Sequence, residues 1–142
     1  MIFKILLEKF KMDHKQLKKG VWDEDINRYP LDCYTFITKC GYKGEIKRNF
    51  MWIYCGYVYL PEGHPDFHKS TFELESEIVV HGDLTFGSKG KFGFDCGHSE
   101  DLIPIDKTIG YIFPYEKHYW TFEEVKREIE NMARQFKLRE LS

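Results

Sequence analysis

The sequence has no excess of basic residues: 21 Lys and Arg stand against 23 Asp and Glu, which gives a formal net charge of −2. A protein that binds nucleic acid usually carries a basic surplus, because neutralising phosphates supplies much of its affinity. The basic stretch at residues 9–19 is followed by Asp23, Glu24 and Asp25, and charge runs of this kind usually form a solvated face. Nucleic acid is therefore not an expected partner.

Long hydrophobic runs are also missing. No stretch reaches the roughly 18 apolar residues that a membrane span needs, and residues 1–10 lack the cleavage pattern of a signal peptide. The four cysteines form no CxxC pair, and at 142 residues a chain can bury a sufficient core without disulfides. We therefore expect reduced thiols, no membrane partner and a soluble protein of the cytoplasm.

Aromatic residues are abundant, at 17% of the chain, and they favour a compact β-rich core. The first twenty residues fit an amphipathic helix or, over residues 2–7, an edge strand. Residues 22–30 are polar and typical of a turn, and residues 97–119 are expected to be irregular. Alternating β-formers predict strands at residues 33–40, 51–60 and 78–80, with 51–60 as a central strand and 81–86 continuing or pairing with 78–80.

A hairpin is predicted where Gly87 to Gly90 supplies turn residues between two strand-like segments. In the strand that follows, Phe92, Phe94 and Cys96 share one face, since side chains alternate along a strand. That face is expected to be the buried one.

The most distinct element is a C-terminal helix. Thr121 and Glu124 form a capping box, and Trp120 is placed to pack on Val125 as a hydrophobic staple. The apolar positions recur at helical spacing and define one face: Val125, Ile129, Met132, Ala133 and Phe136. The fold expected is thus α+β, a single compact domain over residues 1–142, with a mainly antiparallel sheet and this helix packed on it.

Residues capable of chemistry are concentrated in one part of the chain, and they are Cys55, His64, Asp66, His68, His81, Asp83, Asp95, Cys96, His98 and Asp101. If residues 81–83 lie on a strand, His81 and Asp83 point to the same face, and Cys96 and His98 do so if the next strand extends that far. Two such pairs on neighbouring strands would converge on one ion or one substrate.

A metal site is one interpretation of this cluster. His81, Cys96 and His98 are ligand types that zinc accepts, with Asp83 as a fourth candidate. The spacing matches no standard zinc motif, so the cofactor stays open, with zinc as the candidate. The alternative is that Cys96 is a small buried hydrophobe and that the histidines bind local backbone groups.

Catalysis without metal is a second interpretation. Cys96 and His98, with Asp95, Asp101 or His81 nearby, contain the components of a Cys-His-Asp arrangement of nucleophile, base and orienting group. His81 and His98 could instead act as general acid and base on a phosphate-containing ligand, with a lysine (Lys69, Lys89 or Lys91) at the phosphate. The ligand-binding candidates are Tyr57, which could stack on a nucleobase, together with His64, Thr85 and Asp101. For His64, a hydrogen bond that fixes its proline-flanked loop is the competing role.

Several short segments, taken together, resemble a family of small proteins found in phage and prophage genomes. The segments are CGYVYLPEGHP at residues 55–65, HGDLTF at 81–86 and FGFDCGHSED at 92–101. The family carries CGYV-VP-GHP, HGGLT and GFDC-H--D motifs in the same order, and the similarity covers roughly residues 21–136. Asp83 replaces the second glycine of HGGLT, so it is a poor candidate for a ligand common to the family. The resemblance implies a context, a phage-type accessory protein in bacterial cytoplasm, rather than a reaction.

Three functions remain open from the sequence. The first is a counter-defence protein that binds or degrades a nucleotide-type small molecule. The second is a metal-dependent hydrolase, and the third is an interaction module, not an enzyme, that inhibits a host protein. Edge strands and surface aromatics also leave homodimerisation open.

Overall fold

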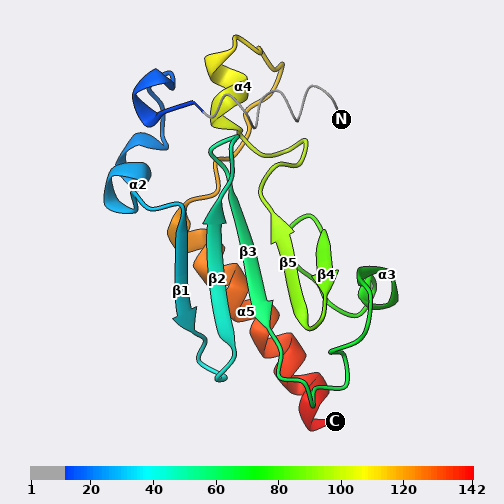
Figure 1. Cartoon of the computed structure of the whole chain (residues 1–142). Helices are drawn as coiled ribbons and strands as arrows, with labels where there is room; N and C mark the ends of the chain where they lie inside the picture. The colour runs from blue at the N-terminus through cyan, green and yellow to red at the C-terminus, as the bar shows by residue number, and fades with distance from the viewer. Residues whose placement is uncertain (1–11) are drawn as a thin grey trace.

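The computed structural model describes residues 12–142, so the expectations for the first eleven residues lie outside it. The strands are β1 (Cys33–Ile37), β2 (Lys43–Arg48), β3 (Tyr54–Tyr59), β4 (Phe86–Ser88) and β5 (Lys91–Asp95). The helices are the 3-10 turn η1 (His14–Gln16), α2 (Asp23–Arg28), α3 (Thr71–Leu74), α4 (Pro104–Thr108) and α5 (Phe122–Leu141). All strand pairs are antiparallel, in the order β1-β2-β3-β5-β4, and β3 lies at the centre (Figure 1).

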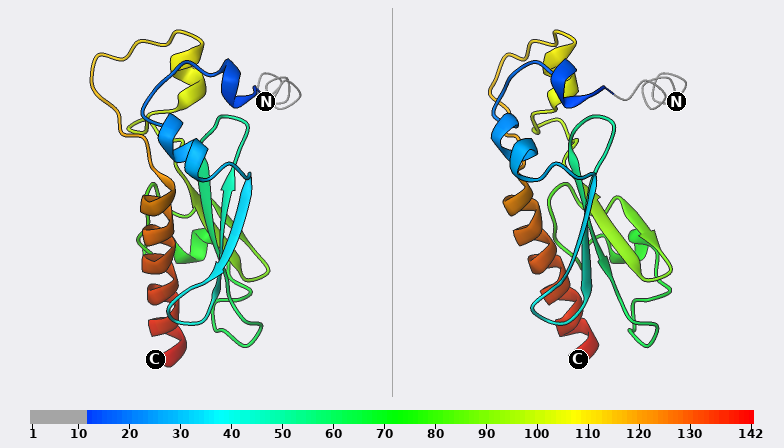
Figure 2. Two further views of the ribbon diagram at one scale, coloured as in Figure 1. Left: turned by 90° about the vertical axis from the view of Figure 1, so that its left-hand side faces the viewer. Right: turned by 60° about the vertical axis from the view of Figure 1, so that its left-hand side comes forward.

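The sheet carries α5 on one face only. This helix runs behind β2 and β3, and the two views of Figure 2 show it as a second layer beside the sheet. The opposite face, turned to the viewer in Figure 1, carries no helix of the described residues. The fold is therefore the expected α+β domain, a five-stranded antiparallel sheet with a long C-terminal helix packed against it.

Two glycines let α5 approach the sheet closely. A Cβ atom on Gly56 would lie 2.7 Å from Phe94 and 2.9 Å from Cγ1 of Ile129, and a Cβ atom on Gly44 would lie 3.1 Å from Cγ2 of Ile129. All three distances are shorter than ordinary van der Waals contact. Ile129, itself fully buried, thus occupies a space that exists because these two strand positions have no side chain.

Both ends of α5 are fastened by polar contacts. At the N-terminal end, Asp25 of α2 accepts hydrogen bonds from the hydroxyl groups of Tyr54 (2.7 Å) and Tyr119 (2.9 Å) and from the amide of Phe122 (3.2 Å). At the C-terminal end, Arg139 donates to buried Asp66 through Nε (2.6 Å) and Nη2 (3.0 Å). The helix therefore bridges α2 and the loop that follows β3.

The C-terminal helix agrees with the sequence in detail. Thr121 accepts a hydrogen bond from the Glu124 amide and donates its own amide to the Glu124 carboxylate, so the capping box is confirmed. The predicted apolar face is also confirmed, since all its members are buried: Val125, Ile129, Met132, Ala133 and Phe136.

The hairpin is confirmed as well. The turn between β4 and β5 has Lys89 at φ 49° and Gly90 at φ 78°, the two positive angles of a two-residue type I′ turn. Phe92, Phe94 and Cys96 are all buried, as predicted. The strands expected within residues 33–40 and 51–60 are β1 and β3.

The strand predicted at residues 78–80 is wrong, and so is its continuation through 81–86, of which only Phe86 begins β4. Side chains of α5 take the backbone groups that a partner strand would use. The Val79 amide donates to Gln135, the Val79 carbonyl accepts from Gln135, and the His81 amide donates to Glu128. The segment therefore runs extended along the helix without a strand partner.

Two further expectations need correction. The polar residues 22–30 form the helix α2 rather than a turn, because its three acidic residues lie in the first helical turn, where the helix dipole favours negative charge, and Ile26 is buried. The irregular stretch 97–119 contains the short helix α4, with Pro104 at its start. Within residues 12–142, none of the helices has the length and apolar character needed to cross a membrane.

Replacing Gly56 with Ala should lower the free energy of unfolding by about 2 kcal/mol, because the added methyl group overlaps Phe94 and Ile129. The matched control is Gly63→Ala, since a Cβ atom at Gly63 meets nothing within 4 Å. Urea denaturation followed by circular dichroism measures both. Equal stability of the two variants would contradict the close packing of α5 on the sheet.

Candidate functional site

A histidine and a buried carboxylate form the centre of the candidate site. His81 Nε2 lies 2.9 Å from both carboxylate oxygens of Asp101, whose side chain is almost fully buried. An ionised carboxylate can only accept, so Nε2 carries the hydrogen and Nδ1 is left as the basic nitrogen of the ring. This is the arrangement by which a carboxylate fixes the tautomer and the orientation of an imidazole.

A second imidazole stands beside the first. The rings of His81 and His98 meet edge to face with their centroids 5.7 Å apart. Asp101 also accepts a hydrogen bond from the His98 amide at 2.9 Å, so one carboxylate positions both histidines. His98 Nε2 lies 3.4 Å from Asp95 Oδ1, and it is a buried atom without a hydrogen-bond partner.

Gly82 explains how the histidines come so close. A Cβ atom at this position would lie 2.1 Å from His98 Nε2, and the backbone has φ +64°, a conformation that favours glycine. Asp83 follows at φ +67°, and its amide donates to the Val80 carbonyl, so residues 80–83 form a turn and not a strand. His81 and Asp83 consequently do not share a strand face, contrary to the expectation.

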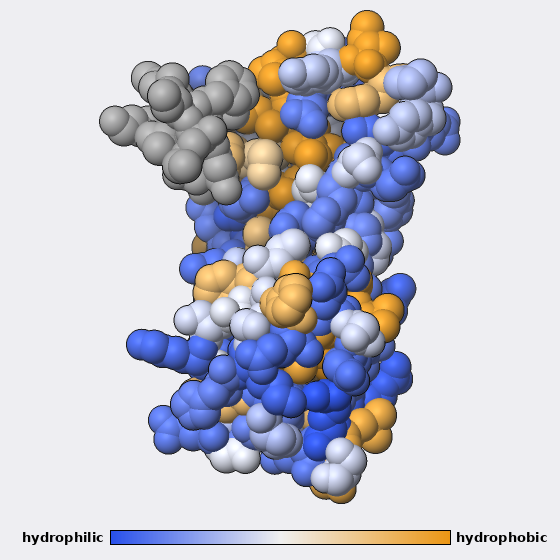
Figure 3. All heavy atoms as spheres, turned by 90° about the vertical axis from the view of Figure 1, so that its right-hand side faces the viewer, coloured by the Kyte–Doolittle hydropathy of each residue, from blue (hydrophilic) through white to orange (hydrophobic). Residues whose placement is uncertain are grey.

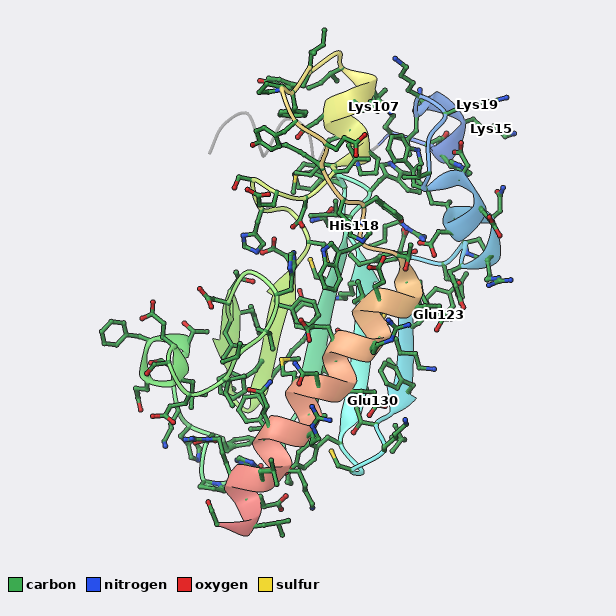
Figure 4. The ribbon with its side chains drawn as sticks, turned by 180° about the vertical axis from the view of Figure 1, so that it is seen from behind. Lys15, Lys19, Lys107, His118, Glu123 and Glu130 are labelled. Atoms are coloured by element: carbon green, nitrogen blue, oxygen red, sulfur yellow. The ribbon has the colours of Figure 1, made fainter. Side chains whose placement is uncertain are left out.

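Trp120 covers the other side of His81. The two ring centroids are 4.1 Å apart at an interplanar angle of 32°. From the sequence, Trp120 was expected only to pack on Val125 as a hydrophobic staple. Its position in the sequence gave no indication of a contact with His81. The Asp101 turn is tied to the same segment, because the amide of Leu102 donates to the carbonyl of His118 at 2.7 Å, and His118 lies beside the start of α5 (Figure 4).

Tyr57 lies on the open face of the sheet. Its ring covers Gly93, where a Cβ atom would lie only 2.4 Å from the tyrosine ring, and it meets Phe86 edge-on at 5.7 Å. The ammonium group of Lys91 lies 4.3 Å from the ring centroid, and it also forms an ion pair with Glu45 at 3.2 Å. Burial raises the pKa of the Tyr57 hydroxyl above its usual value, so this group stays protonated at neutral pH.

Thr85 and Cys96 are the remaining candidates. Thr85 is exposed just before β4, and its amide donates to the Gly93 carbonyl. Cys96, one residue beyond the end of β5, is buried like Phe92 and Phe94, and burial raises the pKa of its thiol. A protonated, buried thiol is a poor nucleophile, so the structure does not support that role for Cys96.

His64 is also separate from the site. It is buried beneath the C-terminal half of α5, with Nε2 2.7 Å from the Phe136 carbonyl and Nδ1 accepting the Asp66 amide at 2.9 Å. Both ring nitrogens are thus used inside the fold, and no nitrogen is left for a ligand. Of its two possible roles, the structure supports the one in which it fixes its loop.

The structure does not arrange the proposed zinc ligands His81, Cys96 and His98 around one point. Among residues 12–142, no three His, Cys, Asp or Glu side chains form a group that could hold a metal ion. The site brings together His81, Asp95, His98 and Asp101, with Tyr57 on the adjoining sheet face and Thr85 exposed before β4, whereas His64 and Cys96 are buried.

Comparison of the chain with protein-family models, with curated proteins and with solved structures finds no match. The site must therefore be interpreted from its own geometry.

Asp66 should make the stability of the protein depend on acid pH. Hydrogen bonds from Arg139 and Lys69 hold the pKa of Asp66 below its ordinary value. Its stabilising effect is complete above the pKa of an unfolded aspartate, about 3.9, and is lost as the pH falls through the lower folded value. The free energy of unfolding of Asp66→Asn should thus be lower than wild type at pH 7, with the gap closing as the pH falls below about 4.

Urea denaturation at a series of pH values measures this gap, with Glu75→Gln, an exposed carboxylate, as control. A constant difference between wild type and Asp66→Asn at every pH would contradict the assignment of Asp66 as the ionised partner of Arg139.

Proposed function

We propose that this protein binds a nucleotide-type small molecule at the pair of imidazoles formed by His81 and His98. The observation that supports this most directly is the shared carboxylate: Asp101 orients His81 through both its oxygens and His98 through its amide. Two imidazoles at this separation can donate to a phosphate when protonated and act as base when neutral. A histidine that serves only to fix a loop needs no second imidazole beside it.

The surroundings of the pair include an aromatic ring and a lysine. Asp95 connects His98 to the open sheet face, on which the Tyr57 ring packs over Gly93. Lys91 lies over that ring and is paired with Glu45. Degradation of the ligand, with one imidazole as base and the other as acid, is compatible with the same arrangement. The motif resemblance supports a setting in which a phage accessory protein sequesters a nucleotide signal of host defence.

A second candidate function is an interaction module. The loop after α4 exposes hydrophobic side chains, with Ile112 93% and Tyr111 62% accessible. In Figure 3, hydrophobic residues gather at the end of the molecule that carries α4, above a mainly hydrophilic lower half. Such a surface favours contact with a protein partner. The metal-dependent hydrolase is not proposed, because its ligands do not converge.

The nucleotide proposal is tested by thermal unfolding in a panel of mono-, di- and cyclic nucleotides. At a concentration about 100-fold above its Kd, a ligand should raise Tm by about 6 to 10 °C, since it binds only the folded state. His98→Asn should lose this shift, and chromatography of the recovered nucleotide separates binding from degradation. His68→Ala is the matched control, because His68 is exposed and its ring meets that of Phe67.

Absence of any shift across the panel, with protein that is folded by circular dichroism, would overturn the proposal. An equal shift in wild type and His98→Asn would place the ligand elsewhere.

A further inference from the structure

The loop after α4 (residues 109–117) exposes an unusual concentration of large apolar side chains. Four of them fall within seven residues of the chain, and they are Ile109, Tyr111, Ile112 and Tyr115. Among the described residues, no other segment of seven exposes more than two such side chains. Single apolar residues on a surface need no explanation, whereas a cluster of them marks a surface that meets something other than water.

The loop projects from the molecule. Its first residues are fastened to the end of α4, because the amide of Gly110 donates to the Lys107 carbonyl (3.3 Å) and the amide of Tyr111 donates to the Asp106 carbonyl (3.0 Å). Beyond them the chain forms an arc that extends past α4 at one end of the protein (Figure 2). Ile112 lies on this arc with 93% of its surface exposed. A projection of this shape can insert into a fluid phase, which needs no matching socket.

Lysines lie around the same end of the protein. The amide of Lys18 donates to the hydroxyl group of Thr108 at 3.0 Å, so the segment after η1 is tied to α4. Figure 4 shows Lys15, Lys19 and Lys107 at this end, and all three are exposed. Residues 12–20 and 102–117 together contain five lysines and three carboxylates, a net charge of +2, whereas the whole chain carries −2. The apolar loop therefore lies in the more basic part of the protein.

We infer that this end of the protein binds the surface of an anionic membrane, with the loop after α4 inserted between lipid headgroups and the lysines against their negative charge. Tyr111 and Tyr115 suit this depth, because a tyrosine has an apolar body and a polar hydroxyl group, and Ile112 supplies the wholly apolar contact. Each lysine near such a surface adds to the attraction. The charge also argues against a second copy of the chain, since its equivalent end would carry the same positive charge.

This inference goes beyond the proposed function and uses none of the histidines. The expectation of no membrane partner rested on the lack of a membrane span and of a signal peptide, and a protein that contacts only the membrane surface needs neither. The second candidate function assigns the same loop to a protein partner, so the test must separate a lipid surface from a protein.

Vesicle flotation tests the inference, with phosphatidylcholine alone or mixed with about 30% phosphatidylserine to supply the negative charge. The protein should bind the mixed vesicles about tenfold more tightly, and added salt should weaken the binding. Ile112→Ser should weaken it about tenfold, because one apolar side chain is lost from the lipid. Lys107→Gln should weaken it about fivefold and reduce its dependence on salt.

Two matched controls lie away from this end of the protein. Phe72→Ser removes an exposed apolar side chain from α3, and Lys39→Gln removes an exposed lysine from the turn after β1 (Figure 1). Neither should change vesicle binding. Ile112→Ser should also keep the rise in Tm with nucleotide, so that failure of the membrane inference and failure of the proposed function can be told apart.

Three results would overturn the inference. The first is folded protein that does not bind the mixed vesicles, as expected if the loop contacts only a protein. The second is equal binding to vesicles with and without phosphatidylserine, or equal losses in Ile112→Ser and Phe72→Ser. The third is self-association in gel filtration that Ile112→Ser abolishes, without vesicle binding, which would assign the loop to a second copy of the chain.

Discussion

The contact of Ile129 with Gly44 and Gly56 is the constraint on which the rest of the structure depends. It fixes the distance between α5 and the two central strands at a value that no side chain larger than glycine permits. With α5 held there, its apolar stripe packs on β2 and β3 at the middle of one face of the sheet. The other face carries Tyr57 and Tyr59, whose rings lie under Lys91 and Lys43.

The same helix assembles the histidine site from parts that are distant in the chain. Glu128 holds the amide of His81, and the segment before α5 supplies Trp120 against the His81 ring and the carbonyl of His118 to the Asp101 turn. Asp25, which receives the Phe122 amide and two tyrosine hydroxyls, keeps the beginning of the helix in this place. A shift of α5 would thus disturb the sheet face and the imidazole pair together.

The sequence predicted the secondary structure around the histidine site better than it predicted which residues form the site. The hairpin at Lys89 and Gly90 and the capping box at Thr121 follow from local chemistry, since turn and cap residues act on their own backbone. The strand predicted between Ile78 and Asp83 was wrong because backbone amides of this segment donate to side chains of α5, 47 to 56 residues away, and not to a neighbouring strand. His64 and Cys96 resembled site residues in type and position, yet burial assigns both to the core.

The sequence by itself thus determined the α+β class, the apolar face of α5, the central strand and the part of the chain in which chemistry-bearing residues gather. The spacing of apolar residues and the capping residues involve only neighbouring positions in the chain, so the sequence alone predicts the elements that they define. Only the tertiary structure decided which of those residues meet: that Asp101 orients both His81 and His98, that Trp120 covers the first, and that Tyr57 and Tyr59 face outward beside lysines. These are contacts between residues far apart in sequence, and they depend on strand order, on register and on how closely α5 can approach two glycines.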